Sequence, residues 1–208
     1  MARPRTTSDE AVLRAAGRVL GRLGPGRLTL AAVAAEAGLA PATIVQRFGS
    51  KRGLLLALAR RAGPDARRFF QDARNRLTRP NGVPGGPAGG AGPLEVLLAA
   101  LQAMAGTVRT PEEMANSLAF LQLDLTDPEF RELATLHFGI VGEEITALLA
   151  EAAAAGDLAP GADTAALARS VHIAYNGVLI VWAMTGEGGT LEQALHAGLD
   201  RLLAPHRA

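Results

Sequence analysis

The sequence predicts an all-α protein, and three observations support this prediction. Capping residues are repeatedly followed by apolar residues at helical spacing, no segment sustains the alternation of apolar and polar residues typical of a strand, and Pro or Gly stands where one helix should give way to the next. With 208 residues, of which 49% are hydrophobic, the chain is long enough to bury a core in one or two domains.

The first expected helix begins after Ser8, whose hydroxyl suits the N-cap position, and ends at Gly24-Pro25-Gly26. We expect its apolar stripe to pack beneath the two helices that follow. This stripe consists of Val12, Leu13, Ala16, Val19, Leu20 and Leu23.

The segment from Leu28 to Leu54 predicts two short helices joined by a tight turn. Thr29 is an N-cap residue, and Gly38 supplies the permissive backbone on which the first of these helices stops. Pro41 then stands at the first turn of a second helix that extends to Phe48. This pattern is typical of a helix-turn-helix, whose second helix lies in the major groove of DNA. We therefore expect a protein that recognises a DNA sequence.

The rest of the chain is also expected to be helical. Ser50 begins a fourth helix that runs to about Ala62, and Gly63-Pro64 separates it from a fifth helix that ends near Thr78. Residues 79–93 are so rich in Gly and Pro that they predict a flexible loop. Capping sequences then predict helices over about 111–124, 128–155 and 163–185, and a last one from 190 that ends before Pro205.

Charge is divided unevenly along the chain. Residues 1–61 hold eleven Lys or Arg against three Asp or Glu, a net of +8, whereas residues 62–208 hold ten against seventeen, a net of −7. A basic N-terminal part is what phosphate binding requires. We therefore predict a helix-turn-helix DNA-binding domain over residues 1–62 and a second, helical domain over residues 63–208.

Composition argues against several other classes of protein. The chain has no Cys, so it offers no disulfide, thiolate nucleophile or zinc finger. The N-terminus lacks the apolar stretch of a secretory signal, and the charge-free stretch from Ser170 to Gly186 falls short of a membrane span. We expect a cytoplasmic location and no membrane partner.

Motifs of enzymes and metal sites are also missing from the sequence. Glu192, His196 and Asp200 share one helix face, where an ion-paired surface is a simpler explanation than a metal site. We therefore expect no enzymatic activity, and hence no catalytic residue, no metal and no cofactor.

The segment TIVQRFGSKRGL, residues 43–54, together with AAEAGL at residues 34–39, resembles the signature of the tetracycline-repressor (TetR) family of one-component transcriptional regulators. The chain departs from that signature at Val45, where Tyr is usual, and at Ala40, where Ser or Thr is usual. The resemblance implies a homodimer, most often a repressor, that binds a palindromic operator in double-stranded DNA. It also implies release from DNA by a small-molecule effector bound in the second domain.

Candidate DNA-binding residues follow from side-chain chemistry and position. Hydroxyls or an ammonium group near a helix N-terminus suit phosphates, Gln suits adenine, Arg suits guanine, and small apolar groups suit thymine methyls. The candidates are Thr29, Pro41, Ala42, Thr43, Val45, Gln46, Arg47 and Lys51.

Two further sets of candidates lie in the later helices. For a mostly apolar effector, residues with aromatic bulk or a polar tip are predicted, although most would serve equally well in a core. They are Phe70, Met104, Phe120, Leu121, His137, Phe138, Tyr175, Asn176 and Trp182. For a four-helix dimer interface, the last two helices offer Ala174, Gly177, Val178, Val181, Leu195, Leu199 and Leu202, unless these residues complete an internal core.

A second function remains compatible with the sequence. The chain could instead be a helical small-molecule-binding or enzymatic bundle whose N-terminal motif no longer reads DNA. The charge division and Lys51 favour the DNA-binding regulator.

Overall fold

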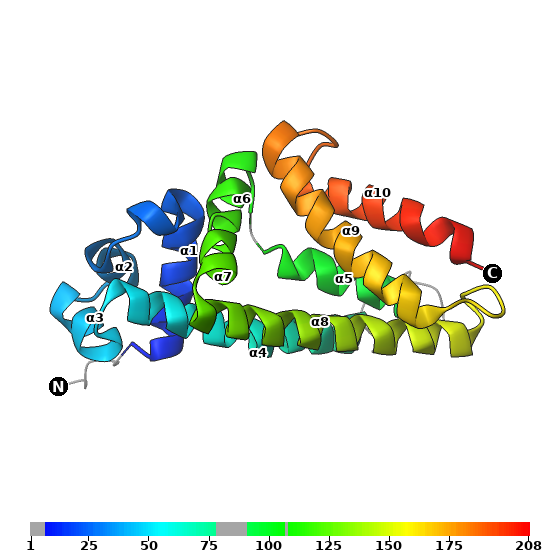
Figure 1. Cartoon of the computed structure of the whole chain (residues 1–208), viewed down its shortest axis with the longest axis horizontal. Helices are drawn as coiled ribbons and strands as arrows, with labels where there is room; N and C mark the ends of the chain where they lie inside the picture. The colour runs from blue at the N-terminus through cyan, green and yellow to red at the C-terminus, as the bar shows by residue number, and fades with distance from the viewer. Residues whose placement is uncertain (1–6, 78–90, 107) are drawn as a thin grey trace. The chain divides into compact units, whose positions relative to one another are not determined.

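The computed structural model describes residues 7–77, 91–106 and 108–208 (Figure 1). Within these residues every regular element is helical, and the only strand-like pairing is an isolated bridge between Leu158 and Arg207. The predicted all-α fold is therefore confirmed. The chain divides into two compact units, residues 1–62 with 112–134 and residues 63–111 with 135–208.

Local capping explains where the helices of the first unit begin. The hydroxyl of Ser8 accepts a hydrogen bond from the Ala11 amide (3.2 Å), and that of Thr29 accepts one from the Ala32 amide (3.1 Å), as the sequence predicted. Gly24 and Gly38 adopt positive φ values of 71° and 67°, which end the regular part of the first helix and the whole of the second. These helices are α1 (Asp9–Arg27), α2 (Leu30–Ala37) and α3 (Pro41–Phe48).

The predicted break at Gly63-Pro64 is wrong, because α4 runs without interruption from Lys51 to Leu77. Pro64 removes a single backbone donor, which a long helix can lose while the rest of its hydrogen bonds persist. Gly63 is buried, and a Cβ there would come within 2.7 Å of the Ile140 Cδ1 atom. Gly63 therefore lets a neighbouring helix approach closely instead of ending its own.

Residues 112–134 pack with the first unit, whereas the sequence analysis assigned them to the second domain. They contain α6 (Pro111–Leu118) from its second residue, α7 (Leu121–Thr126) and the beginning of α8 (Pro128–Ala155), so the predicted helix over 111–124 is divided near Phe120. Phe130 has only 1% of its surface exposed and lies in the apolar core built around Leu28 and Ile44.

Polar contacts join the same segment to α1 and to the start of α4. The Asn116 amide donates to the carbonyl oxygens of Gly21 (3.0 Å) and Arg22 (3.1 Å) at the end of α1. Arg52 donates to Asp127 and to Glu129, each at 2.8 Å. The partners in these contacts lie far apart in sequence, so no local sequence pattern predicts the contacts.

Asp124 on α7 gives a pH-dependent prediction. Burial raises the pKa of its carboxyl group from 3.8 to about 6. The unfolded chain therefore releases this proton more readily, and stability falls as the pH rises from about 4 to about 6. Asp124→Asn should stabilise the protein at pH 7.5 by about 1 kcal/mol, allowing for the partial exposure of the side chain.

Urea denaturation at pH 7.5 and pH 3.5 would test this expectation. The gain from Asp124→Asn should shrink towards zero at pH 3.5, where both states hold the proton. Asp72→Asn, at an exposed position on α4, is the matched control and should change stability little. An equal gain from Asp124→Asn at both pH values would contradict the prediction.

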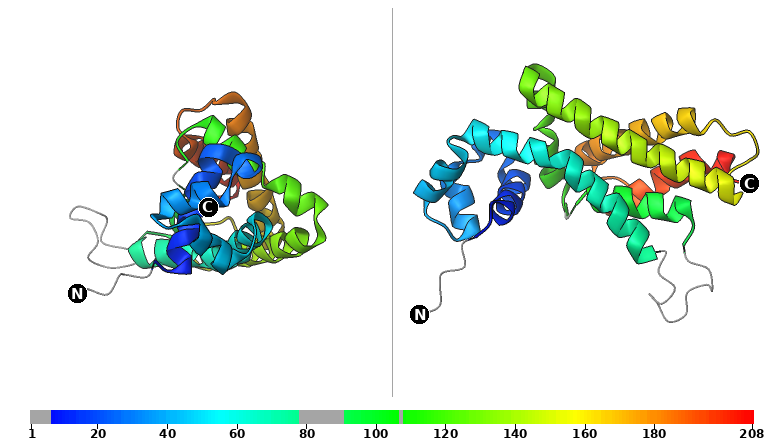
Figure 2. Two further views of the ribbon diagram at one scale, coloured as in Figure 1. Left: turned by 90° about the vertical axis from the view of Figure 1, so that its left-hand side faces the viewer. Right: turned by 90° about the horizontal axis from the view of Figure 1, so that it is seen from below.

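Two helices of the second unit pack along each other (Figures 1 and 2). Asp163 caps the first of them, and Thr190 forms a capping box with Gln193 at the start of the second, as predicted. Gly198 lacks a Cβ, and a Cβ placed there would lie 2.7 Å from the Val178 Cγ2 atom. This glycine therefore allows the two helices to approach each other closely. These helices are α9 (Thr164–Thr185) and α10 (Leu191–Leu203).

The second unit also contains the later part of α4, most of α8, α5 (Pro93–Met104), which the sequence did not predict, and a short 3-10 helix at Ala204–His206. Residues 79–90 of the predicted flexible loop lie outside the described residues. By length and composition α8 and α9 are apolar enough to cross a membrane, whereas the sequence analysis judged the second of them too short. The core helices of water-soluble proteins pass the same test. Only 28% of the apolar window of α9 is buried, so much of its surface is left uncovered.

Candidate nucleic-acid interface

The helix α3 has one buried and one exposed face. Ile44 is completely buried and anchors the helix in the core of the first unit. The opposite face carries Pro41, Ala42, Val45 and Gln46, all exposed, with 47% of Val45 accessible. Thr43 is half-buried at the edge between the two faces.

Arg47 is directed away from that exposed face. Its guanidinium donates to the Thr7 carbonyl oxygen at 2.5 Å and to the Asp9 carboxylate at 3.2 Å, and only 19% of the side chain is exposed. Arg47 therefore connects α3 to the start of α1.

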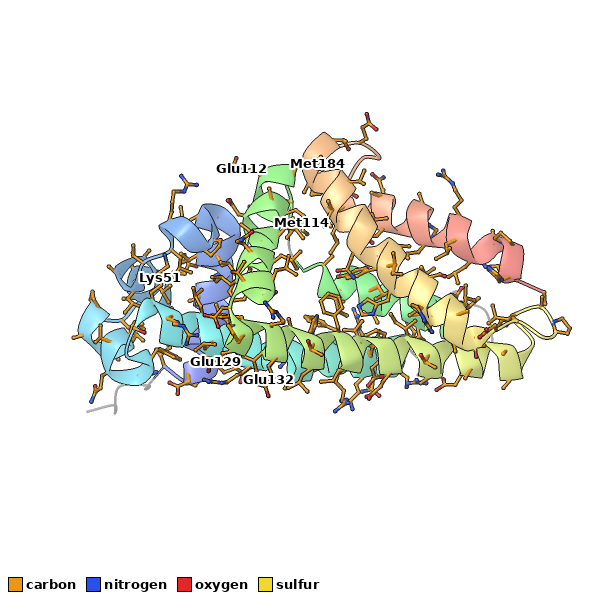
Figure 3. The ribbon with its side chains drawn as sticks, viewed as in Figure 1. Lys51, Glu112, Met114, Glu129, Glu132 and Met184 are labelled. Atoms are coloured by element: carbon orange, nitrogen blue, oxygen red, sulfur yellow. The ribbon has the colours of Figure 1, made fainter. Side chains whose placement is uncertain are left out.

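Two other predicted residues lie at helix N-termini. The Lys51 ammonium group, at the start of α4, donates to the Gly26 carbonyl oxygen at 2.8 Å (Figure 3). Thr29 is exposed, and its hydroxyl, which already accepts the Ala32 amide, retains a hydrogen to donate. The first-turn amides of α2 and α4 add positive potential beside these groups, an arrangement suited to phosphate.

The few carboxylates of helices α1 and α2 are ion-paired. Glu36 contacts Arg18 at 2.7 Å and Arg22 at 2.6 Å, and hydrogen bonds from these two guanidinium groups lower the pKa of Glu36. Asp9 pairs with Arg47, and Glu10 pairs with Arg14 at 2.6 Å. Because Lys and Arg outnumber these three acids, the helix-turn-helix region keeps a net positive charge.

The predicted effector-binding residues are divided between the two units. Phe120 and Leu121 lie in the first unit, where the Phe120 ring packs edge-on against Phe130 at 5.6 Å. The other predicted residues lie in the second unit. There Phe70, Tyr175 and Trp182 are buried, Met104, His137 and Asn176 are half-buried, and Phe138 is partly exposed.

His172, which was not among the predicted residues, joins three of them. Its ring centroid lies 5.1 Å from that of Phe138, and the Phe138 centroid lies 5.9 Å from that of His137. The Asn176 amide donates to the His172 carbonyl oxygen at 2.8 Å. Burial and the nearby His137 charge lower the pKa of His172, which favours its neutral form. The sequence could have identified His172 by its position four residues before Asn176, on the same face of the helix.

A cavity of about 480 Å³ lies in the second unit and was not predicted. Its polar groups come from the end of α4, from α5 and the turn after it, and from the start of α10. The side chains include Arg76, Gln102, Arg109, Thr190 and Glu192. Leu195 is the one predicted site residue that lines it.

An exposed apolar stripe runs along α9. Ile173, Ile180, Val181 and Met184 have between 41% and 79% of their surface exposed and, with Gly177, occupy one side of the helix (Figure 3 labels Met184). Of the residues predicted for a dimer interface, Gly177 and Val181 belong to this stripe. Ala174, Val178 and Leu202 are half-buried.

Leu195 and Leu199 require a correction. Both have 0% of their surface exposed, because the apolar face of α10 turns towards the core of its own unit. They therefore cannot form part of a surface that meets a partner.

Two protein families together match most of the described chain. The family described as "Bacterial regulatory proteins, tetR family" matches residues 12–58, and the family described as "BetI-type transcriptional repressor, C-terminal" matches residues 93–204. The second match alone covers more than half of the sequence. No match was found among curated proteins.

Solved structures show the same fold at low sequence identity. A protein from Saccharomonospora viridis in complex with choline is 20% identical, with a TM-score of 0.68 over 94% of each chain. FadR from Bacillus subtilis in complex with stearoyl-CoA is 19% identical, with a TM-score of 0.63 over 95% of this chain and 98% of FadR. SmeT, the repressor of the Stenotrophomonas maltophilia multidrug efflux pump SmeDEF, is 21% identical, with a TM-score of 0.62 over 97% of this chain and 91% of SmeT. Together with the capped helix-turn-helix, these matches show that the chain belongs to the TetR family of bacterial transcriptional regulators.

Proposed function

We propose that this protein is a homodimeric, cytoplasmic repressor that binds a palindromic operator and is released from it by a small, mostly apolar effector. In this proposal the first unit reads DNA through residues 1–62, and the second unit supplies effector binding and dimerisation. The observation that carries it is the exposed face of α3, which projects from a region whose acids are paired with arginines. Such a face can enter a major groove, while the positive charge around it attracts phosphate.

Dimerisation is supported by the stripe on α9. Exposed apolar side chains in one row are unfavourable in water unless another surface covers them. A two-fold axis would place the stripe of one copy against that of a second copy, so that the same residues serve both sides. Two recognition helices would then be held at a fixed spacing, as a palindrome requires.

The effector is proposed to bind in the second unit, which carries most of the predicted aromatic residues. Fold relatives were solved with ligands as different as stearoyl-CoA, choline and triclosan, so the fold alone does not select a chemical class. Here the buried rings of Phe70, Tyr175 and Trp182 favour apolar carbon, while His137 and Asn176 offer polar contacts. Trp182 is the only tryptophan, so its fluorescence provides a direct measure of binding.

Fluorescence anisotropy with the DNA that flanks the gene would test the function. The full-length protein should form a sequence-selective complex whose affinity falls steeply with salt, whereas a shuffled duplex should bind weakly. The alternative, a helical small-molecule-binding or enzymatic bundle, predicts equal and weak binding to both duplexes.

Substitution of Arg47 should weaken DNA binding without changing the oligomeric state. Arg47→Ala removes the contacts to Thr7 and Asp9, so α3 is held less firmly against α1. We expect about a tenfold loss of affinity that is similar for different sequences, because positioning and not base recognition is lost.

Anisotropy titrations against the operator and a shuffled duplex, together with size-exclusion chromatography, would measure this loss. Arg14→Ala is the matched control, because Arg14 forms only an exposed ion pair within α1. Unchanged operator binding by Arg47→Ala would show that the contacts of Arg47 with Thr7 and Asp9 do not position α3 for DNA binding.

A further inference from the structure

The exposed face of α3 is unusually poor in groups that recognise guanine. Its residues follow one another at helical spacing as Pro41, Ala42, Val45 and Gln46, three of them apolar and one an amide. Neither Arg nor Lys belongs to this face, because the only cation of α3, Arg47, lies on the other side.

The two nearby cations are both engaged in backbone contacts. Arg47 holds the Thr7 carbonyl and the Asp9 carboxylate, and its side chain is four-fifths covered. Lys51 follows the recognition helix instead of belonging to it, and its ammonium group donates to Gly26. A guanine contact through a bidentate Arg or Lys is therefore not available from α3 as it stands.

The chemistry of the exposed face matches adenine–thymine pairs. In the major groove the thymine methyl is the one apolar group on a base edge, and Val45 is a large apolar side chain on α3 with 47% of its surface exposed. Gln46, next along the helix, can make paired hydrogen bonds to the N6 and N7 atoms of adenine.

We infer that α3 specifies A·T base pairs, with Val45 against a thymine methyl and Gln46 against an adenine. This inference rests on the proposed operator binding and identifies what the operator must contain. Each half-site should hold an A·T-rich core, and phosphate contacts should supply most of the remaining affinity.

Replacement of single thymines by deoxyuridine would test the contact, because it removes only the methyl group. The half-site would first be selected from random duplexes with the full-length protein, and each thymine would then be replaced in turn. One position in each half-site should lose about fourfold in affinity, the value expected for burying one methyl group. Replacement of thymines in the flanking DNA is the control and should have no effect.

Variants of the protein then identify the side chain responsible. Val45→Ala should abolish the deoxyuridine effect at that position, whereas Val45→Ile should retain it. Gln46→Ala should lose at least about fivefold discrimination at a neighbouring adenine, and 7-deazaadenine at that base should have the same effect on the wild type. Because both residues are exposed, thermal melting of the variants should match that of the wild type.

The possible failures can be distinguished from one another. Selective, salt-sensitive binding that ignores every deoxyuridine substitution, or a selected core of G·C pairs, would overturn this inference and leave the proposed function intact. Absence of any sequence-selective complex would refute both.

Discussion

Val181→Arg is expected to convert the proposed dimer into a 21.5 kDa monomer and to lower operator affinity by at least about a hundredfold. Val181 lies on the apolar stripe of α9 with 56% of its surface exposed, so the folded monomer tolerates a longer side chain. In a two-fold interface each substitution occurs twice, which places two unpaired guanidinium groups in an apolar contact. A monomer could occupy only one half-site, and the affinity contributed by the second would be lost.

Light scattering coupled to size-exclusion chromatography would give the mass, and anisotropy would give the operator affinity. Ala147→Arg is the matched control, since it adds the same charge at an exposed position of α8 in the same unit. A Val181→Arg protein that stays dimeric would show that the stripe is covered by something other than a second copy. Dissociation of both variants would indicate a general effect of added charge.

Local signals in the sequence predicted local structure well. Ser8, Thr29, Asp163 and Thr190 each begin a helix by accepting a hydrogen bond from an amide two or three residues later, so the pattern contains the whole interaction. The prediction of a helix break at Pro64 was wrong because it used local signals only. The effect of Pro64 depends on the neighbouring helix, which contacts Gly63 through Ile140, and a local reading cannot include that contact.

In the candidate site, too, contacts between distant parts of the sequence could not be predicted. The exposed residues of α3 were identified from the turn and helix spacing, but the contact of Arg47 with Thr7 spans forty residues and was not foreseen. On α10 the spacing of Leu195 and Leu199 indicated an apolar face correctly, yet spacing cannot say whether such a face meets its own unit or another molecule. Only the burial of each side chain distinguishes these outcomes.

Phe130→Ala is expected to destabilise the first unit by about 3–5 kcal/mol, a large part of the stability of a typical domain. The Phe130 ring is 1% exposed in the core of the helix-turn-helix, packs against Phe120, and has the Arg52 guanidinium 5.5 Å from its centroid. Removing it leaves a cavity beneath the helices that are proposed to contact DNA. Operator binding should therefore weaken, although Phe130 lies more than eighty residues beyond α3 in the sequence.

Phe138→Ala provides the matched control, because it removes the same ring just over two turns along the same helix, where 39% of Phe138 is exposed. Urea denaturation followed by circular dichroism should show a loss below about 1.5 kcal/mol for this variant and at least twice that for Phe130→Ala. The difference arises because the exposed ring already contacts water and leaves no closed cavity. Equal losses would mean that residues 112–134 are not integral to the DNA-binding unit. A large loss confined to Phe130→Ala would establish that this unit includes a segment that the sequence pattern alone assigns elsewhere.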